Sequence, residues 1–259
     1  MACFLPPYWL PLLMLHVLLA TSPVLSDQND PARLLKFKSS LNNAGHLSNW
    51  DPDIPPCTGE SPNWNGMICN KEGNVFGLLL DNMGLSGMID VDTLAEVTSI
   101  RTISFMNNSF EGVMPNFLKI VTLRGIFLSN NKFSGEIGSD AFKGMSSLRR
   151  VELANNNFSG KIPTSLTQLP LLVDLQLQNN QFEGEIPEFE QKDLKVNFAN
   201  NRLVGSIPEG LSNQDPSSFA GNNLCGKPLS PCKKIIRANY QSHTSHAPTY
   251  PHRLRRAAA

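Results

Sequence analysis

Residues 148–163 read LRRVELANNNFSGKIP, and this stretch decides the fold. Apolar side chains stand at positions 148, 151 and 153, then come Asn156, Phe158, Gly160 and the pair Ile162-Pro163. The alternation of apolar and other residues at 150–154 predicts a short strand with one buried face. An asparagine where the chain leaves that strand offers two donors and an acceptor to buried backbone groups.

The same pattern recurs with a period near 24 residues, in six copies. A single strand cannot bury its apolar face alone, whereas stacked copies share one core and form a long parallel sheet. We therefore predict an α/β repeat solenoid. The first copy has Met83 in place of the asparagine, and the other five predict a ladder made of Asn108, Asn131, Asn156, Asn180 and Asn201.

Charge and composition exclude several classes of protein. The whole chain is neutral, but residues 27–232 hold 16 basic and 22 acidic residues, a net charge of −6, which argues against nucleic acid as a partner. A hydrolase is disfavoured because Gly-x-Ser-x-Gly and His-Glu-x-x-His motifs are absent from the sequence. We predict no catalytic residues, no cofactor and no metal site.

The first residues predict a secretory route. Residues 1–26 carry no charged side chain, and their apolar centre is interrupted by prolines, which favours a cleaved signal peptide over a retained anchor. No later stretch of 18 apolar residues occurs, so no membrane span is expected in this chain. We expect an extracellular or cell-surface location.

Four cysteines remain after the signal peptide, and they allow three connectivities. Local pairs, Cys57 with Cys69 and Cys225 with Cys232, are favoured because they flank the repeats and close short loops. The alternative, a zinc site, lacks the usual C-x(2–4)-C spacing. An open solenoid exposes its core, so both cysteine pairs are expected in caps, the first with Trp50 and Trp64.

These features predict an order of parts along the chain: signal peptide at 1–26, N-terminal cap at 27–74, six repeats at 75–210, C-terminal cap at 211–232 and a basic, disordered tail at 233–259. The tail carries six basic residues and no acidic one. It is interpreted either as an element that attracts polyanionic surfaces or as an incidental sequence left by truncation.

The repeats resemble plant-type leucine-rich repeats with their Leu-x-Gly-x-Ile-Pro extension, and the cap around Trp50, Cys57, Trp64 and Cys69 resembles those of plant receptor-like kinase ectodomains. The segments 83–90, 101–108, 127–135, 140–145 and 218–226 are similar to the pollen receptor-like kinase family. The resemblance covers about residues 30–232 and implies an ectodomain that senses small secreted peptides, often cysteine-rich, in pollen-tube growth and guidance. It also implies a co-receptor ectodomain as a possible partner, and full-length relatives in the plasma membrane.

The sequence departs from that family after Cys232. Family members continue into a membrane helix and a kinase-like domain, but this sequence has no Gly-x-Gly-x-x-Gly, His-Arg-Asp or Asp-Phe-Gly motif, so phosphate transfer is not expected of it. A truncated or spliced receptor product and an ectodomain produced alone are both compatible with this. A soluble secreted decoy or inhibitor with the same fold is the rival function.

The repeat template also predicts which side chains face the concave sheet: those six, four and two residues before each ladder position. The strip changes from small and apolar to charged and polar along the chain. The ligand-binding candidates are Leu79, Met106, Phe127, Arg150, Glu152, Asp174, Gln176 and Lys195. Two alternatives stay open: the charges pair across neighbouring strands, or Lys195, Arg202 and the Cys225–Cys232 loop carry the contacts.

Two glycosylation sequons accompany the repeats. They are Asn107-Asn-Ser109 and Asn157-Phe-Ser159. Each first asparagine lies beside a ladder position and not on it, so we expect Asn107 and Asn157 to be accessible for modification.

Overall fold

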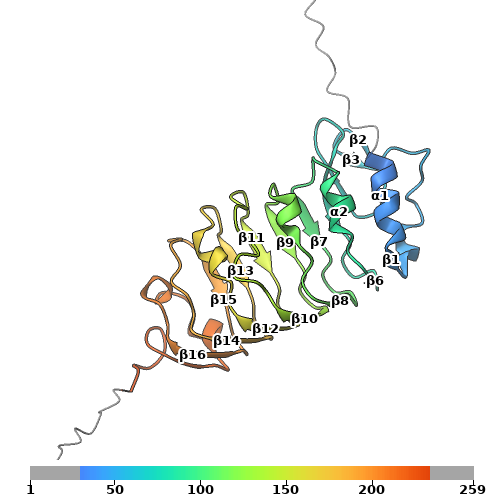
Figure 1. The fold of residues 1–259 in the computed structure, drawn as a ribbon. Coiled ribbons are helices and arrows are strands. Elements are labelled where there is room, and N and C mark those ends of the chain that lie inside the picture. The colour runs from blue at the N-terminus through green and yellow to red at the C-terminus, as the bar shows by residue number, and fades with distance from the viewer. Residues whose placement is uncertain (1–29, 234–259) are drawn as a thin grey trace, which may run out of the picture.

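The computed structural model describes residues 30–233 and shows a curved stack of coils with a cap at its N-terminal end (Figure 1). The signal peptide predicted at 1–26 and residues 234–259 of the predicted tail lie outside the described residues. The predicted fold, a capped α/β solenoid with a parallel sheet, is confirmed.

One strand of each coil joins the concave sheet, which has seven strands in the described part of the chain. Its repeat strands pair in parallel, whereas β4 of the cap pairs antiparallel with β5. The strands are β4 (Met67–Cys69), β5 (Val75–Leu79), β7 (Thr102–Ser104), β9 (Gly125–Phe127), β11 (Arg150–Glu152), β13 (Asp174–Gln176) and β15 (Lys195–Asn197).

A second parallel sheet runs along the side of the solenoid, just after the ladder asparagine of each coil. We call it the lateral sheet; in Figure 1 it follows the lower edge of the stack. Its strands are β8 (Glu111–Gly112), β10 (Lys132–Glu136), β12 (Asn157–Lys161), β14 (Gln181–Gly184), β16 (Arg202–Ser206) and β17 (Asn223–Cys225).

Short helices return the chain between coils on the convex side. Most are single 3-10 turns, since the coil leaves few residues for the return. They are α2 (Val91–Ala95), η2 (Phe117–Ile120), η3 (Thr164–Gln168), η4 (Glu209–Leu211) and η5 (Pro216–Phe219).

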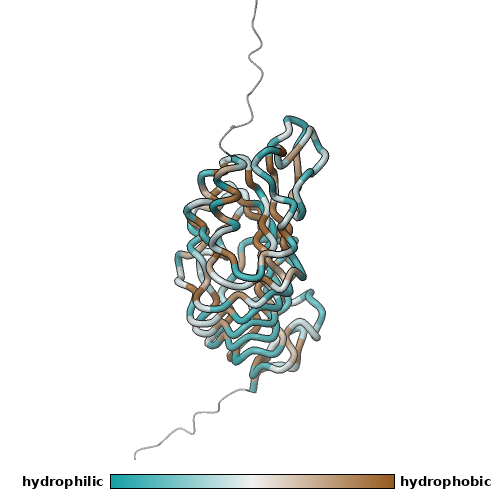
Figure 2. The backbone as a smooth tube through the Cα atoms, turned by 90° about the vertical axis from the view of Figure 1, so that its right-hand side faces the viewer, coloured by the Kyte–Doolittle hydropathy of each residue, from teal (hydrophilic) through white to brown (hydrophobic). Residues whose placement is uncertain are grey.

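The core is a continuous column of apolar side chains inside the coils. Along the backbone tube of Figure 2, apolar residues recur as brown segments from coil to coil. A phenylalanine follows the first four ladder positions by two residues, and each of these rings stacks on the next, with ring centroids 6.0 to 6.3 Å apart. Each coil thus keeps its neighbour's ring dry, which explains why one coil alone would not fold. The rings belong to Phe110, Phe133, Phe158 and Phe182.

The N-terminal cap closes one end of this column. It contains α1 (Asp30–Ser39), β1 (Leu41–Asn42), η1 (Ala44–Leu47), β2 (Cys57–Thr58) and β3 (Ser61–Pro62). Trp50 and Trp64, which the sequence placed in this cap, are buried and stack with ring centroids 5.3 Å apart, and Cys57 and Cys69 form a disulfide in the same cap. The second disulfide, Cys225–Cys232, lies at the other end, so both predicted local pairs form.

Candidate ligand-binding face

The register of the concave sheet sets predicted ligand contacts side by side. One row runs Gly77, Thr102, Gly125, Arg150, Asp174, Lys195, and the next runs Leu79, Ser104, Phe127, Glu152, Gln176, Asn197. Neighbours in a row sit on strands about 4.8 Å apart. A ligand lying along the solenoid would therefore meet one residue of each coil in turn.

The N-terminal half of this face is apolar. Leu79 is 40% exposed, while Met106 and Phe127 are half-buried. The Phe127 ring folds back over Gly125, where a Cβ atom would lie only 2.5 Å from a ring carbon. Gly125 is thus required for the ring to lie flat on the sheet. In the same way the Ile68 side chain covers Gly77.

The C-terminal half is polar and carries close carboxylates. The Gln176 amide donates to Asp174 at 2.6 Å. Burial, and then the nearby Asp174 carboxylate, raise the pKa of Glu152, against the opposing effect of Arg150. The Glu152 carboxylate is therefore partly desolvated.

The alternative in which these charges pair across neighbouring strands is not found among the described residues. Within residues 30–233, Arg150, Glu152, Asp174 and Lys195 form no ion pair; the pairs present are Arg33 with Asp30 and Glu96, and Lys119 with Asp92. Arg150 faces Asp174 in the register, yet their charged groups stay apart. The charged groups of this face are left available to a partner.

The ladder asparagines hold neighbouring coils together at the side. Asn156 accepts from the Phe133 N–H and donates to the carbonyls of Leu128, Leu153 and Ala154, with each bond between 3.0 and 3.1 Å. Asn131, Asn180 and Asn201 form the same four contacts in their own coils. In the first coil, which lacks the asparagine, the Met83 and Leu85 N–H groups donate to Asn108.

Two features of this side were not predicted. The ladder continues into the predicted C-terminal cap through Asn222, which accepts from the Leu203 N–H and donates to three carbonyls. The signal was present, since Phe219, Asn222, Leu224 and Gly226 fit the repeat template 21 residues after Asn201. The cap is therefore built on a further, partial coil, with β17 parallel to β16.

The second feature is a left-handed residue just before each ladder position. Asparagines occupy it from Asn82 to Asn200, with φ between 54° and 59°, and Gly221 takes the place in the partial coil. Asparagine and glycine tolerate this conformation best, which explains the repeated Asn-Asn pairs of the sequence. Asn107 is one of these residues and is exposed, as is Asn157 in β12.

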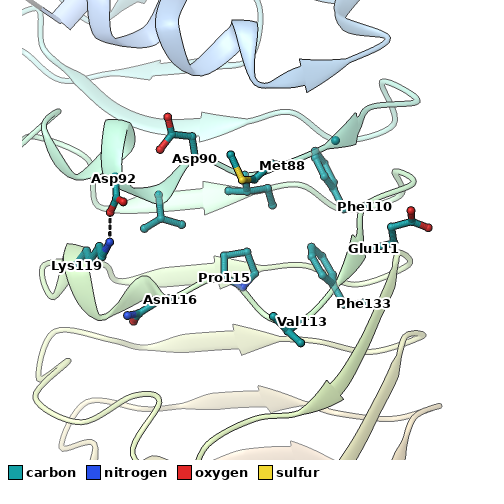
Figure 3. Close-up of a pocket in the computed structure, with 13 residues that line it drawn as sticks. Met88, Asp90, Asp92, Phe110, Glu111, Val113, Pro115, Asn116, Lys119 and Phe133 are labelled. Atoms are coloured by element: carbon teal, nitrogen blue, oxygen red, sulfur yellow. Dashed lines mark hydrogen bonds and ion pairs between the residues drawn. The ribbon is translucent and has the colours of Figure 1, made fainter.

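The lateral sheet is interrupted between the first two coils. β6 (Ser86–Gly87) turns away to pair antiparallel with β1 of the cap, which leaves β8 as the edge of its sheet. A pocket of about 440 Å³ opens there, shown in Figure 3. Met88 and Val113 line it and are 66% and 70% exposed. At its rim, Asp90 caps α2, and hydrogen bonds from the Thr93 hydroxyl and N–H lower the pKa of its carboxyl group.

Comparison with known protein families identifies the class. Residues 27–70 match the family described as Leucine rich repeat N-terminal domain, and residues 121–182 match the one described as Leucine rich repeat. Both matches fall on the regions that the structure shows as cap and coils. The molecule is a plant-type leucine-rich-repeat solenoid.

Single relatives narrow the class to a family. Pollen receptor-like kinase 4 of Arabidopsis thaliana is 55% identical over 206 residues, which make up 79% of this chain and 30% of that protein. The crystal structure of a Pollen Receptor Kinase 3 superposes with a TM-score of 0.71 at 43% identity, covering 77% of this chain and 99% of the crystallised one. The chain belongs to the pollen receptor-like kinase family and corresponds to its leucine-rich-repeat ectodomain.

A more distant solved structure comes from a complex. The receptor kinase HAESA of Arabidopsis, crystallised with the peptide hormone IDA and the co-receptor SERK1, superposes with a TM-score of 0.65 at 26% identity, over 78% of this chain and 35% of that one. Among the helices that the structure describes here, none has the length and apolar character of a membrane span.

Proposed function

We propose that this chain is the extracellular ligand-sensing part of a pollen receptor-like kinase. Its concave face binds a small secreted peptide during pollen-tube growth or guidance, and a co-receptor ectodomain is a further partner. Membership of the pollen receptor-like kinase family supports a role in pollen. The complex of HAESA with a peptide hormone supports peptide binding by a related fold. The residues of this face carry the rest of the argument.

The apolar strip at the N-terminal half of the sheet is the observation on which the proposal rests. Leu79 is 40% exposed, and Phe127 and Met106 keep part of their surfaces in water. The core does not need them, because the inward positions of the same strands, such as Ile103 and Ile126, are fully buried. Apolar side chains gathered on an otherwise polar concave face indicate a contact surface.

The test compares this strip with equally exposed apolar residues elsewhere. The immobilised chain is incubated with the peptides secreted by pollinated pistils, and bound peptides are identified by mass spectrometry. Leu79→Ala with Phe127→Ala is expected to lower the affinity for a captured peptide about tenfold or more, since two apolar side chains that the peptide would cover are truncated. Leu171→Ala with Val204→Ala is the control, because these residues are 42% and 40% exposed outside the concave sheet.

Equal capture by both double variants would contradict the proposal. Thermal unfolding of each variant, followed by circular dichroism, separates lost binding from lost fold.

We also propose that the chain follows the secretory route and carries glycans at Asn107 and Asn157. Both side chains are exposed, and neither forms a hydrogen bond within residues 30–233. Disulfide-closed caps are typical of oxidising compartments. After expression in a secreting plant cell, the intact mass of the protein should be lower by the mass of one glycan in either Asn107→Gln or Asn157→Gln than in the unsubstituted chain. It should be lower by two glycans in the double variant. An unmodified mass for the unsubstituted chain would contradict this proposal.

A further inference from the structure

Four arginines gather at the start of three consecutive strands of the concave sheet. Arg101, Arg124 and Arg149 stack directly: the Arg124 N–H donates to the Arg101 carbonyl at 2.6 Å, and the Arg149 N–H to the Arg124 carbonyl at 2.8 Å. Their side chains therefore leave the backbone about 5 Å apart. Arg150 follows directly, in the row of Gly125. We call these four residues the arginine rim.

None of these four guanidinium groups has an ion-pair partner in the described part of the chain. Arg101 donates to the carbonyls of Thr98 and Ile100, and the Arg124 guanidinium lies over the Phe76 ring, 5.7 Å from its centroid. Neither Arg149 nor Arg150 forms a side-chain hydrogen bond or ion pair within residues 30–233. Stacked like charges repel, so an anion that bound between them would relieve the repulsion.

A hollow lies within the arginine rim. It measures about 320 Å³ and is lined by Thr102, Arg124, Gly125, Phe127, Arg149 and Arg150. Gly125 carries no side chain in a row where its neighbours, Thr102 and Arg150, have one, and the space where its Cβ would lie holds the Phe127 ring. The Phe127 ring, folded over Gly125, supplies an apolar wall. Guanidinium groups around an apolar wall suit a carboxylate carried on a short aliphatic stem.

We infer that the arginine rim binds acidic side chains of a peptide ligand. The inference rests on the proposed peptide binding and adds the chemistry of the ligand. Residues 27–232 carry a net charge of −6, so the rim is a local positive site on an acidic domain and steers acidic segments toward itself. Glu152 and Asp174 in the C-terminal half repel such a segment.

The test uses a fluorescein-labelled, C-terminally amidated hexaglutamate peptide, with hexaglutamine as the neutral probe. Fluorescence anisotropy measures binding to the full chain at low salt and at about 0.15 M salt. Arg124→Gln with Arg149→Gln is expected to weaken hexaglutamate binding about tenfold or more, because charge-assisted hydrogen bonds are lost. The control, Lys132→Gln with Lys161→Gln, removes the same charge from exposed positions of the lateral sheet and should change binding less than about twofold.

A second variant tests the hollow without changing charge. In Gly125→Ala the new Cβ atom would lie 2.5 Å from a Phe127 ring carbon, so the ring that forms the apolar wall of the hollow must shift. We expect a several-fold loss of hexaglutamate binding with an intact arginine rim. Variants that fail to unfold cooperatively are replaced by Arg149→Lys, which keeps the charge, loses the bidentate geometry and should give an intermediate loss.

Three results would overturn the inference: equal losses in the arginine and lysine variants, equal binding of hexaglutamate and hexaglutamine, or an oligogalacturonate of equal charge that binds tenfold tighter than the peptide. The last would assign the arginine rim to polysaccharide. Failure here is separable from failure of the proposed function. If peptide capture depends on Leu79 and Phe127 but hexaglutamate does not bind, the inference about the arginine rim is wrong and the proposed function stands. If hexaglutamate binds to the arginine rim but peptide capture does not depend on Leu79 and Phe127, the proposed function is wrong and the rim remains an acid-binding site.

Discussion

The lateral side and the concave face of the same coils differ in how their residues repeat. At the lateral side, Asn131, Asn156, Asn180 and Asn201 are buried and make the same contacts in every coil. On the concave face, residues in the row from Leu79 to Asn197 differ from coil to coil, and all of them except Ser104 keep part of their surfaces in water. The same residue type recurs where the side chain completes the backbone hydrogen bonds of a neighbouring coil. The residue type varies where the side chain meets only solvent or a ligand.

This difference assigns two roles to one backbone. The lateral side sets the spacing and register of the coils, and the concave face uses that register to place unlike groups in rows. A substitution on the lateral side should therefore change stability, and one on the concave face should change binding. The predictions below test this division.

The largest effect is expected at the middle of the ladder. Asn156→Ala leaves the Phe133 N–H and three carbonyls without their partner in a buried site, which should lower the free energy of unfolding by about 1–3 kcal/mol. Urea unfolding followed by circular dichroism measures this. The control is the adjacent, exposed Asn157→Ala, expected to change stability by less than about 0.5 kcal/mol.

Asn222→Ala sharpens the same comparison at the end of the ladder. Asn222 makes the same kinds of contact but is only half-buried, so water can replace part of what is lost. Its effect should be smaller than that of Asn156→Ala. A larger loss at Asn222 would show that stability is concentrated in the C-terminal partial coil and not spread along the ladder.

Much of the lateral side could be predicted from the sequence because its pattern has a fixed cause. Each coil needs an amide at one position, so the Asn spacing reveals the strands, the core and the facing rows. Asn222 was missed only because its coil is incomplete and was interpreted as cap. The pocket beside Met88 and Val113 could not be predicted, since β6 leaves its sheet for a pairing with β1 that no local pattern encodes.

The arginine rim was missed for a different reason. Arg150 is one of the candidates predicted from the repeat template, but Arg101, Arg124 and Arg149 precede the predicted outward positions, so the template does not single them out. Whether charges pair across strands depends on side-chain conformations that the repeat does not specify. The hollow depends in addition on the Phe127 ring lying over Gly125, a contact between residues two apart that only the structure reveals.

The smallest effect is expected on the concave face, at Glu152. Its raised pKa means that the folded chain binds a proton there more tightly than the unfolded chain, so the ionised carboxylate costs stability. That cost is absent well below the unfolded pKa and grows as pH rises through the folded pKa. Glu152→Gln should therefore raise the melting temperature slightly at about pH 7, and the gain should vanish near pH 4. Glu209→Gln in η4 is the exposed control. A gain in Glu152→Gln that is equal at both pH values would show that the carboxylate is not desolvated, and would remove the basis for a repelling C-terminal half.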